Sequence, residues 1–177
     1  MIHLTKLKES DYAKAGKLVR RIAASCAYDG VSFPKPSFEE KSFSSFSTHG
    51  SIYIAKERGE IIGVIAIDQD VSSFFYPHSH DGGKIIEIVN KTDIRMSEDM
   101  LALAYLGVDF RYQNKGIGKE LLRYAESLYP RFLFLASLDL TNEKGIQFLR
   151  HCGYKRVSKE DFEFPNGVDQ QVLFKRL

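Results

Sequence analysis

Apolar and polar residues alternate over residues 2–8, "IHLTKLK", and this alternation predicts a half-buried strand. Apolar residues then recur at helical spacing as far as about Ala27, so we expect a helix there. Ser10 is predicted to be its N-cap, with Asp11 in the first turn, because a serine oxygen accepts bonds from unpaired N–H groups and an acidic residue suits the positive helix end. The chain thus opens with a strand followed by a helix.

A second helix and a β-hairpin are predicted next. Residues 38–50, "FEEKSFSSFSTHG", favour only a weak helix, because serine prefers caps and turns to helix interiors. Residues 51–57 and 60–68 are rich in β-branched side chains, and they are joined by Arg58 and Gly59. Two such stretches around a short turn with glycine predict a hairpin.

Two continuous apolar runs, residues 101–108 and 132–140, predict central strands that are buried on both faces. Between them, residues 116–129 predict a helix that ends before Pro130. Its apolar face is expected to consist of Ile117, Leu121, Tyr124, Ala125 and Leu128. A strand, a helix and a second strand therefore form the predicted centre of the fold.

The end of the chain predicts one more helix and two more strands. Residues 142–153 form the helix, with Gly153 as its C′ residue, and residues 154–164 and 168–177 form strands around the turn "PNG". Residues 71–99 have no single period and are expected to be an excursion from the core. Its 177 residues are within the size range of one domain, so residues 1–177 are predicted to form a single domain, and the chain contains no internal repeat.

The excursion contains a small histidine cluster. His78, His80 and Asp81 lie close together in "YPHSHDGG", which suggests either a metal site or a solvated loop. The solvated loop is favoured, because zinc sites need three or four ligands and no further ligand lies at a recognisable spacing. We therefore expect no metal.

Composition narrows the functional classes. The chain has 177 residues, with 25 Lys and Arg against 23 Asp and Glu, so its formal charge is +2. Such a small charge argues against nucleic acid or an anionic membrane as partner. No apolar run is long enough to span a bilayer, and a cytoplasmic location is expected. Cys26 and Cys152 have no metal-ligand spacing and are expected to be reduced.

The loop with candidate chemistry is "VDFRYQNKGIGKELL", which leads from a predicted strand into a predicted helix. A helix N-terminus offers unpaired N–H groups and a partial positive charge to an anion. Gly116 and Gly118 have no Cβ atoms that would block phosphate oxygens, and three basic residues raise the local potential: Arg111, Lys115 and Lys119. A phosphate-bearing ligand is predicted, and a glycine-containing turn without a ligand is the alternative.

Two common phosphate motifs do not fit. A Walker A loop requires a hydroxyl residue after Gly-Lys, whereas Glu120 follows Gly118 and Lys119. The dinucleotide fingerprint GxGxxG does not match the spacing QxxGxG.

The loop instead resembles the acetyl-coenzyme A signature of the GNAT (Gcn5-related N-acetyltransferase) superfamily, Q/R-x-x-G-x-G/A. Residues 2–19 are similar to the first strand and helix of that family, "GEIIGVIAID" to a hairpin strand, and "TNEKGIQFLRHCGY" to its asparagine-containing helix. The resemblance implies an α/β (α+β) GNAT-like fold, a mixed, twisted and splayed β-sheet of about seven strands flanked by helices on both faces.

The resemblance also implies a coenzyme site. Leu106, Gly107 and Val108 are expected to pair with the pantetheine arm of acetyl-coenzyme A, and Asn142 to contact the coenzyme. Backbone amides from Gln113 to Gly118 are expected to hold the pyrophosphate. The expected cofactor-binding residues of the loop are Arg111, Gln113, Asn114, Lys115, Gly116, Ile117, Gly118 and Lys119. The expected reaction is transfer of acetyl from the thioester to a neutral primary amine.

The sequence departs from the family pattern at the general acid. Leu149 occupies the position where many relatives have a tyrosine, and the helical spacing turns His151 away from it. Cys152 is interpreted as a buried, inert thiol, with a role as the acid as the alternative. Tyr105 is the catalytic candidate that remains, against the alternative of a packed aromatic residue.

The acceptor is not identified by the sequence. The acidic residues of the excursion are interpreted as lining an acceptor pocket or as solvating the loop: Asp81, Glu87, Asp93, Glu98 and Asp99. The absent tyrosine makes a coenzyme A-binding regulatory or interaction module the alternative function. A nucleic-acid-binding module is disfavoured by the charge. The acyl-chain length and a homodimeric state are left open.

Overall fold

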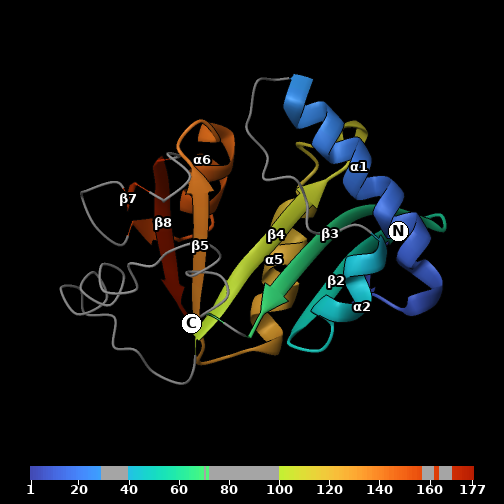
Figure 1. Cartoon of the computed structure of the whole chain (residues 1–177), viewed down its shortest axis with the longest axis horizontal. Coiled ribbons are helices and arrows are strands. Elements are labelled where there is room, and N and C mark those ends of the chain that lie inside the picture. Colours follow the sequence, from blue (N-terminus) through green and yellow to red (C-terminus); the bar gives the residue numbers. More distant parts are fainter. Residues whose placement is uncertain (29–39, 70, 72–99, 157–161, 164–168) are drawn as a thin grey trace. The chain divides into compact units, whose positions relative to one another are not determined.

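The computed structural model describes residues 1–28, 40–69, 71, 100–156, 162–163 and 169–177, and it divides the chain into two compact units (Figure 1). The first unit comprises Met1–Asp68 and Leu103–Pro130, and the second comprises Gln69–Ala102 and Arg131–Leu177. The predicted single domain stays a prediction. Almost all of the predicted excursion, including its histidine cluster and acidic residues, lies outside the described residues.

The first unit is built on four neighbouring strands. Strands β1 (Ile2–Lys6), β2 (Gly50–Glu57) and β3 (Glu60–Asp68) pair antiparallel, and β4 (Met100–Val108) follows β3 in the hydrogen-bonded order. The predicted first strand and hairpin are therefore confirmed. At the hairpin turn, Arg58 has a φ of 50° and Gly59 a φ of 81°. Two positive φ values in sequence match the right-handed twist of the flanking strands.

Two helices lie between β1 and β2 in the first unit, and the predicted N-cap of the first helix is wrong. A 3₁₀ turn, η1 (Glu9–Asp11), precedes α1 (Tyr12–Tyr28), and α2 (Glu40–Phe46) confirms the predicted weak helix. Ser10 lies inside η1, whose N-cap is Lys8, so Ser10 does not cap α1. The reason lies in Asp11, whose buried carboxylate accepts a hydrogen bond from Lys56 Nζ of β2 at 2.7 Å and ties the turn to the sheet.

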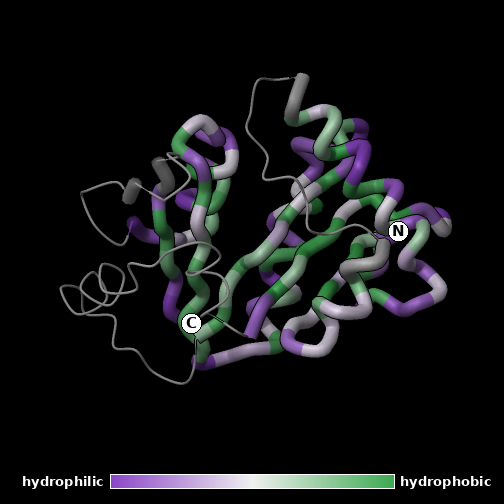
Figure 2. The backbone as a smooth tube through the Cα atoms, in the orientation of Figure 1, coloured by the Kyte–Doolittle hydropathy of each residue, from purple (hydrophilic) through white to green (hydrophobic). Residues whose placement is uncertain are grey.

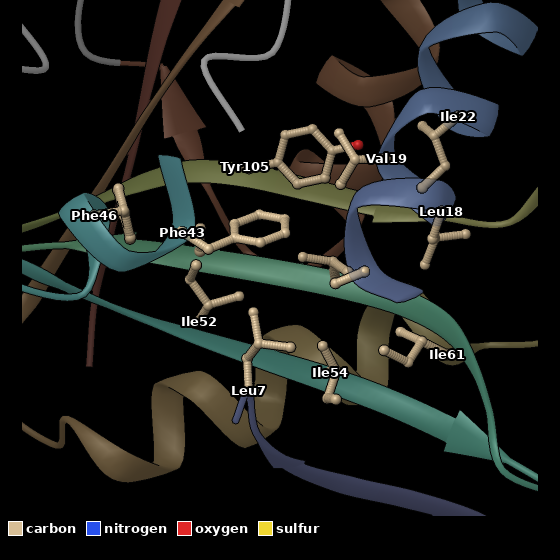
Figure 3. Packing of buried hydrophobic residues seen from close by; sticks show 13 residues of the cluster. Leu7, Leu18, Val19, Ile22, Phe43, Phe46, Ile52, Ile54, Ile61 and Tyr105 are labelled. Atoms are coloured by element: carbon tan, nitrogen blue, oxygen red, sulfur yellow. The ribbon is translucent and has the colours of Figure 1, made fainter. Parts of the chain in front are cut away.

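Helices α1 and α2 cover one face of this sheet, where apolar side chains from both helices and from β2 and β3 form a core (Figure 3). The tube in Figure 2 is hydrophobic along most of β3. Burying such side chains is the main favourable term in folding. The members of this core on α1 and α2 are Ala15, Leu18, Val19, Ile22, Phe43 and Phe46.

Helix α5 (Ile117–Leu128) packs on β2 and β3 from the face opposite to α1 and α2 (Figure 3). It approaches β3 closely at Gly63, where a Cβ atom would lie 2.7 Å from Leu121 Cδ1. The predicted apolar face needs one correction, because Leu128 is 45% exposed and Leu122 is buried in its place. Just after α5, the hydroxyl of Tyr129 lies 3.0 Å from the hydroxyl of Tyr53, and the two form a hydrogen bond. Burial, and secondly this hydrogen bond, raise the pKa of Tyr53 to about 12.

The second unit contains the first three residues of β4 (100–102), together with β5 (Leu133–Asp139), α6 (Glu143–His151), β6 (Lys155–Arg156), β7 (Phe162–Glu163) and β8 (Asp169–Arg176). The order is β4-β5-β8-β6, and β7 also pairs with β8. Three residue pairs join β4 and β5 in parallel, from Met100↔Leu133 to Ala102↔Leu135, whereas β8 pairs antiparallel. The predicted splay beyond these pairs stays a prediction.

The α/β class with a mixed sheet is confirmed. Eight strands are described instead of about seven, because the predicted strand over residues 154–164 contains two short strands, β6 and β7. Gly153 has a φ of 94° and ends α6 as predicted. This left-handed backbone conformation costs glycine nothing sterically.

Candidate functional site

The loop between β4 and α5 is shaped by two left-handed residues. After β4 the chain forms a 3₁₀ turn, η2 (Phe110–Tyr112), and then passes through Asn114 with a φ of 61° and Gly116 with a φ of 81°. Both residue types accept this conformation more readily than most. The N–H of Glu120 bonds to the carbonyl of Gly116 at 3.0 Å and begins the ladder of α5.

Most N–H groups at the start of α5 have no partner among the residues that the structure describes. Within the described part of the chain, no hydrogen bond is found from the backbone N–H groups of residues 114–119. A Cβ atom placed on Gly116 would meet nothing within 4 Å. The start of α5 therefore combines unpaired donors, the positive end of a helix dipole and open space, which together suit an anion.

Asp109 forms hydrogen bonds that support this loop, and it was not among the site residues predicted from the sequence. Its side chain is fully buried, at 0% exposure. The carboxylate accepts hydrogen bonds from the Arg111 backbone N–H at 3.1 Å, from Arg111 Nε at 3.1 Å and from an Arg111 terminal nitrogen at 2.9 Å. Arg21 of α1 donates a further bond at 2.6 Å. The hydrogen bond from the Arg111 side chain is the main reason why the pKa of Asp109 is lowered.

The basic residues of the loop are not equivalent. The positive charge of Arg111 is balanced by Asp109, and Glu60 lies 3.8 Å from the same guanidinium. Lys115 is exposed, and its Nζ lies 4.9 Å from the centroid of the Tyr112 ring, within the range of a cation–π contact. Lys119 is exposed in the first turn of α5. Lys115 and Lys119 therefore contribute more to the potential above the loop than Arg111 does.

The last residues of β4 lead directly into the loop. The Asp109 N–H bonds to the Ile62 carbonyl of β3 at 2.9 Å. Because the backbone groups of successive strand residues point to opposite edges, those of Leu106 and Val108 point away from β3. The Val108 carbonyl accepts a hydrogen bond from Gln113 Nε2 at 3.3 Å. The remaining backbone groups on that edge have the orientation that a peptide-like ligand requires.

Tyr105 points from β4 to the same side as α1 and α2 (Figure 3). It is 6% exposed and belongs to the core with Val19 and Ile22. Gly107 makes room for it, because a Cβ atom there would lie 2.8 Å from the Tyr105 hydroxyl and 2.9 Å from Ile22 Cδ1. Burial, and secondly the nearby Cys26, raises the pKa of Tyr105. The hydroxyl is therefore protonated at neutral pH.

The remaining predicted residues lie in the second unit. Asn142 is the N-cap of α6, where its Oδ1 accepts the Gly145 N–H at 3.0 Å, so its Nδ2 group can still donate to a ligand. Leu149 is buried, and His151 is exposed, as predicted, with its Nδ1 2.7 Å from the Gln147 carbonyl. Cys152 follows α6 and Cys26 lies in α1 of the first unit, and the two form no disulfide; their reduced state stays a prediction.

Among the described residues, no group of His, Cys, Asp and Glu side chains is arranged to hold a metal ion. In the same part of the chain, the helices are too short or too polar to cross a bilayer.

Comparison with known proteins identifies the family. The model of the Acetyltransferase (GNAT) family matches residues 17–154. No curated protein matches the chain. Among solved structures, the chain is similar to the PaiA N-acetyltransferase from Thermoplasma acidophilum in complex with coenzyme A, with a TM-score of 0.68, 14% identity and coverage of 100% of this chain and 99% of that chain.

Two further structures agree. The ribosomal-protein-S18-alanine N-acetyltransferase from Escherichia coli has a TM-score of 0.64 and 14% identity, and 99% of this chain and 94% of that chain are covered. An N-acetyltransferase from Staphylococcus aureus has a TM-score of 0.63 and 15% identity, with coverage of 99% and 98%. At these identities the structures show the fold.

Proposed function

The chain belongs to the GNAT acetyltransferase family and is therefore an acyltransferase, and from this premise we propose that it transfers acetyl from acetyl-coenzyme A to a primary amine. The observation that carries the proposal is that, among the residues the structure describes, the N–H groups of residues 114–119 have no hydrogen-bond partner and the space at Gly116 is open. A pyrophosphate there gains several charge-assisted hydrogen bonds at once.

Each predicted site residue has a part in this proposal. The amides of residues 114–118 hold the pyrophosphate, with Lys115 and Lys119 supplying positive charge, whereas the predicted Gln113 amide already donates to the Phe110 carbonyl at 3.4 Å. The outward backbone groups of Leu106 and Val108 pair with the amides of pantetheine, and Gly107 lies between them in the strand. Asn142 contacts the coenzyme through Nδ2, since its Oδ1 already caps α6. Arg111 serves the loop mainly through its bonds to Asp109.

The reaction requires a neutral amine. A lysine-type amine with a pKa of about 10.4 is neutral in only about one molecule in a few thousand at pH 7, so removal of its proton limits attack on the thioester. A backbone N–H of the outward edge of β4 is suited to polarise the thioester oxygen. The acetyl carbon then forms a bond to nitrogen as its bond to sulfur breaks, and the departing thiolate takes up a proton.

A thiol-release assay tests this function. Purified protein with acetyl-coenzyme A and a panel of amines, including small polyamines and peptides with free N-termini, is expected to release coenzyme A at a rate that depends on one acceptor class. Release that no acceptor accelerates, together with stabilisation of the protein by coenzyme A, would instead favour the regulatory coenzyme-binding module.

We propose Tyr105 as the proton donor to the thiolate. General acid catalysis contributes typically about 10²- to 10⁴-fold. Because its raised pKa makes Tyr105 a weak donor, we expect the Tyr105→Phe variant to lose roughly 10²-fold in kcat, with the affinity for coenzyme A unchanged. Steady-state kinetics with coenzyme titration measure both quantities. An unchanged kcat would show that Tyr105 only packs in the core.

A further inference from the structure

We infer that Asp109 and Arg21 are positioning residues that hold the coenzyme loop in its binding shape and connect it to helix α1. This inference deepens the proposed function and rests on it. Arg21 comes from α1, whereas Asp109 follows β4 and Arg111 lies in η2, so three separate segments meet at one carboxylate.

The geometry around Asp109 is that of a fixed support. Its N–H is bonded to Ile62 of β3, and its two oxygens together receive the Arg111 backbone N–H and two guanidinium nitrogens of the same residue. Planar paired bonds of this kind fix orientation as well as distance. The 3₁₀ turn that precedes Asn114 is thereby held to the sheet. Arg21, with 45% of its side chain exposed, completes the set with the shortest contact, 2.6 Å.

The burial of Asp109 explains why Arg21 is needed. A fully buried carboxylate is costly unless it is paired and hydrogen-bonded. Arg111 alone does not fully compensate the negative charge of Asp109, because a Glu60 carboxylate oxygen also lies 3.8 Å from the same guanidinium nitrogen. Arg21 adds a second positive charge from α1 and leaves Arg111 in place beside the loop.

The direction in which coenzyme affinity changes when Asp109 is replaced distinguishes a positioning role from a direct electrostatic effect. A carboxylate close to an anion site repels a pyrophosphate. If this repulsion were the only effect of Asp109, removing its charge would strengthen coenzyme binding. If Asp109 instead holds the turn, its removal weakens binding. The two effects of the same substitution have opposite directions.

The experiment compares Asp109→Asn, Arg21→Met and Arg21→Lys, with Arg20→Met as the matched control on the same helix. Arg20 is exposed and does not pair with Asp109, so Arg20→Met removes the same positive charge from α1 without breaking a bond to that carboxylate. Coenzyme A affinity is measured by calorimetry, KM for acetyl-coenzyme A and kcat by thiol release, and protection of amides 110–116 by hydrogen exchange in the ligand-free protein.

We expect Asp109→Asn to weaken coenzyme A binding about tenfold or more and Arg21→Met several-fold, as roughly 10-fold effects are common for groups that orient ligand-binding residues. KM is expected to rise while kcat at saturation stays constant, and exchange of amides 110–116 is expected to accelerate. Arg21→Lys is expected to recover most of the affinity, and Arg20→Met to leave it unchanged.

Equal or tighter binding by Asp109→Asn would overturn the inference, as would an Arg21→Met variant that behaves like Arg20→Met. If Asp109→Asn does not fold, the three arginine variants decide the result, because neither Arg20 nor Arg21 is buried. Failure of the wild-type protein to bind coenzyme A would reject the proposed function itself. Normal wild-type binding with no effect of the variants would reject only the positioning role.

Discussion

Replacement of Gly116 by glutamate is expected to abolish coenzyme A binding while the protein remains folded. The glycine has a φ of 81°, and nothing lies within 4 Å of a Cβ atom placed on it. The structural cost is therefore limited to the left-handed backbone of a non-glycine residue, about 1–2 kcal/mol. The new carboxylate, however, occupies the place of the pyrophosphate. Two like charges 4 Å apart near a protein surface repel by about 4 kcal/mol, which is roughly a 10³-fold loss in affinity.

The chain offers a matched control for this variant. Gly59 in the β2–β3 turn has the same φ of 81° and the same open space around its Cβ position. Gly59→Glu therefore carries the same backbone cost and the same added charge, but away from the start of α5, and it is expected to bind coenzyme A normally. Gly116→Gln separates bulk from charge and is expected to be intermediate. Equal calorimetric affinities of Gly116→Glu and wild type would exclude this turn as the coenzyme site.

The second large effect is expected where α5 docks on β3. Leu121 is fully buried, and its Cδ1 atom lies 2.7 Å from the Cβ position of Gly63. Leu121→Ala is expected to lower the free energy of unfolding by about 2–5 kcal/mol, because it removes buried methyl groups and leaves a cavity. Gly63→Ala is expected to cost about 1–3 kcal/mol by overpacking against the same leucine. Denaturant unfolding measures both.

The double variant gives the sharper result. Without the Leu121 methyl groups, an alanine at position 63 has room, and it replaces a glycine that weakens a strand by about 0.5–1 kcal/mol. Gly63→Ala is therefore expected to stabilise the Leu121→Ala protein although it destabilises the wild type. Additive effects, as for residues that do not touch, would contradict the close packing of α5 on β3.

Much of the fold was predictable because its elements have strong periods and clear boundaries. The hairpin, both apolar central strands and the helix that starts near Gly116 were predicted from alternation, apolar runs and the position of Pro130. The errors concern side-chain partners. Ser10 has the chemistry of a cap, but the ion pair of Asp11 with Lys56 holds that segment in a 3₁₀ turn. Tertiary contacts therefore overrode a local preference.

The candidate site was only partly predictable for the same reason. The glycines and lysines of the loop are adjacent in sequence, so their chemistry can be recognised locally. Asp109 pairs with Arg21, which is 88 positions away, and no local pattern indicates that contact. The only local signal was an acidic residue directly after a buried strand and two positions before an arginine. Arg111 was accordingly interpreted as a ligand-facing cation, whereas its charge is largely balanced by Asp109.

The most direct test of the account is a ¹⁵N–¹H NMR titration of the whole chain with coenzyme A. The amides of residues 114–119, which have no partner within the described part of the chain, should form hydrogen bonds to the pyrophosphate, so we predict that their resonances shift downfield, saturate together and stay unmoved in the Gly116→Glu protein. Binding of coenzyme A that leaves these amide resonances unchanged would contradict the central claim.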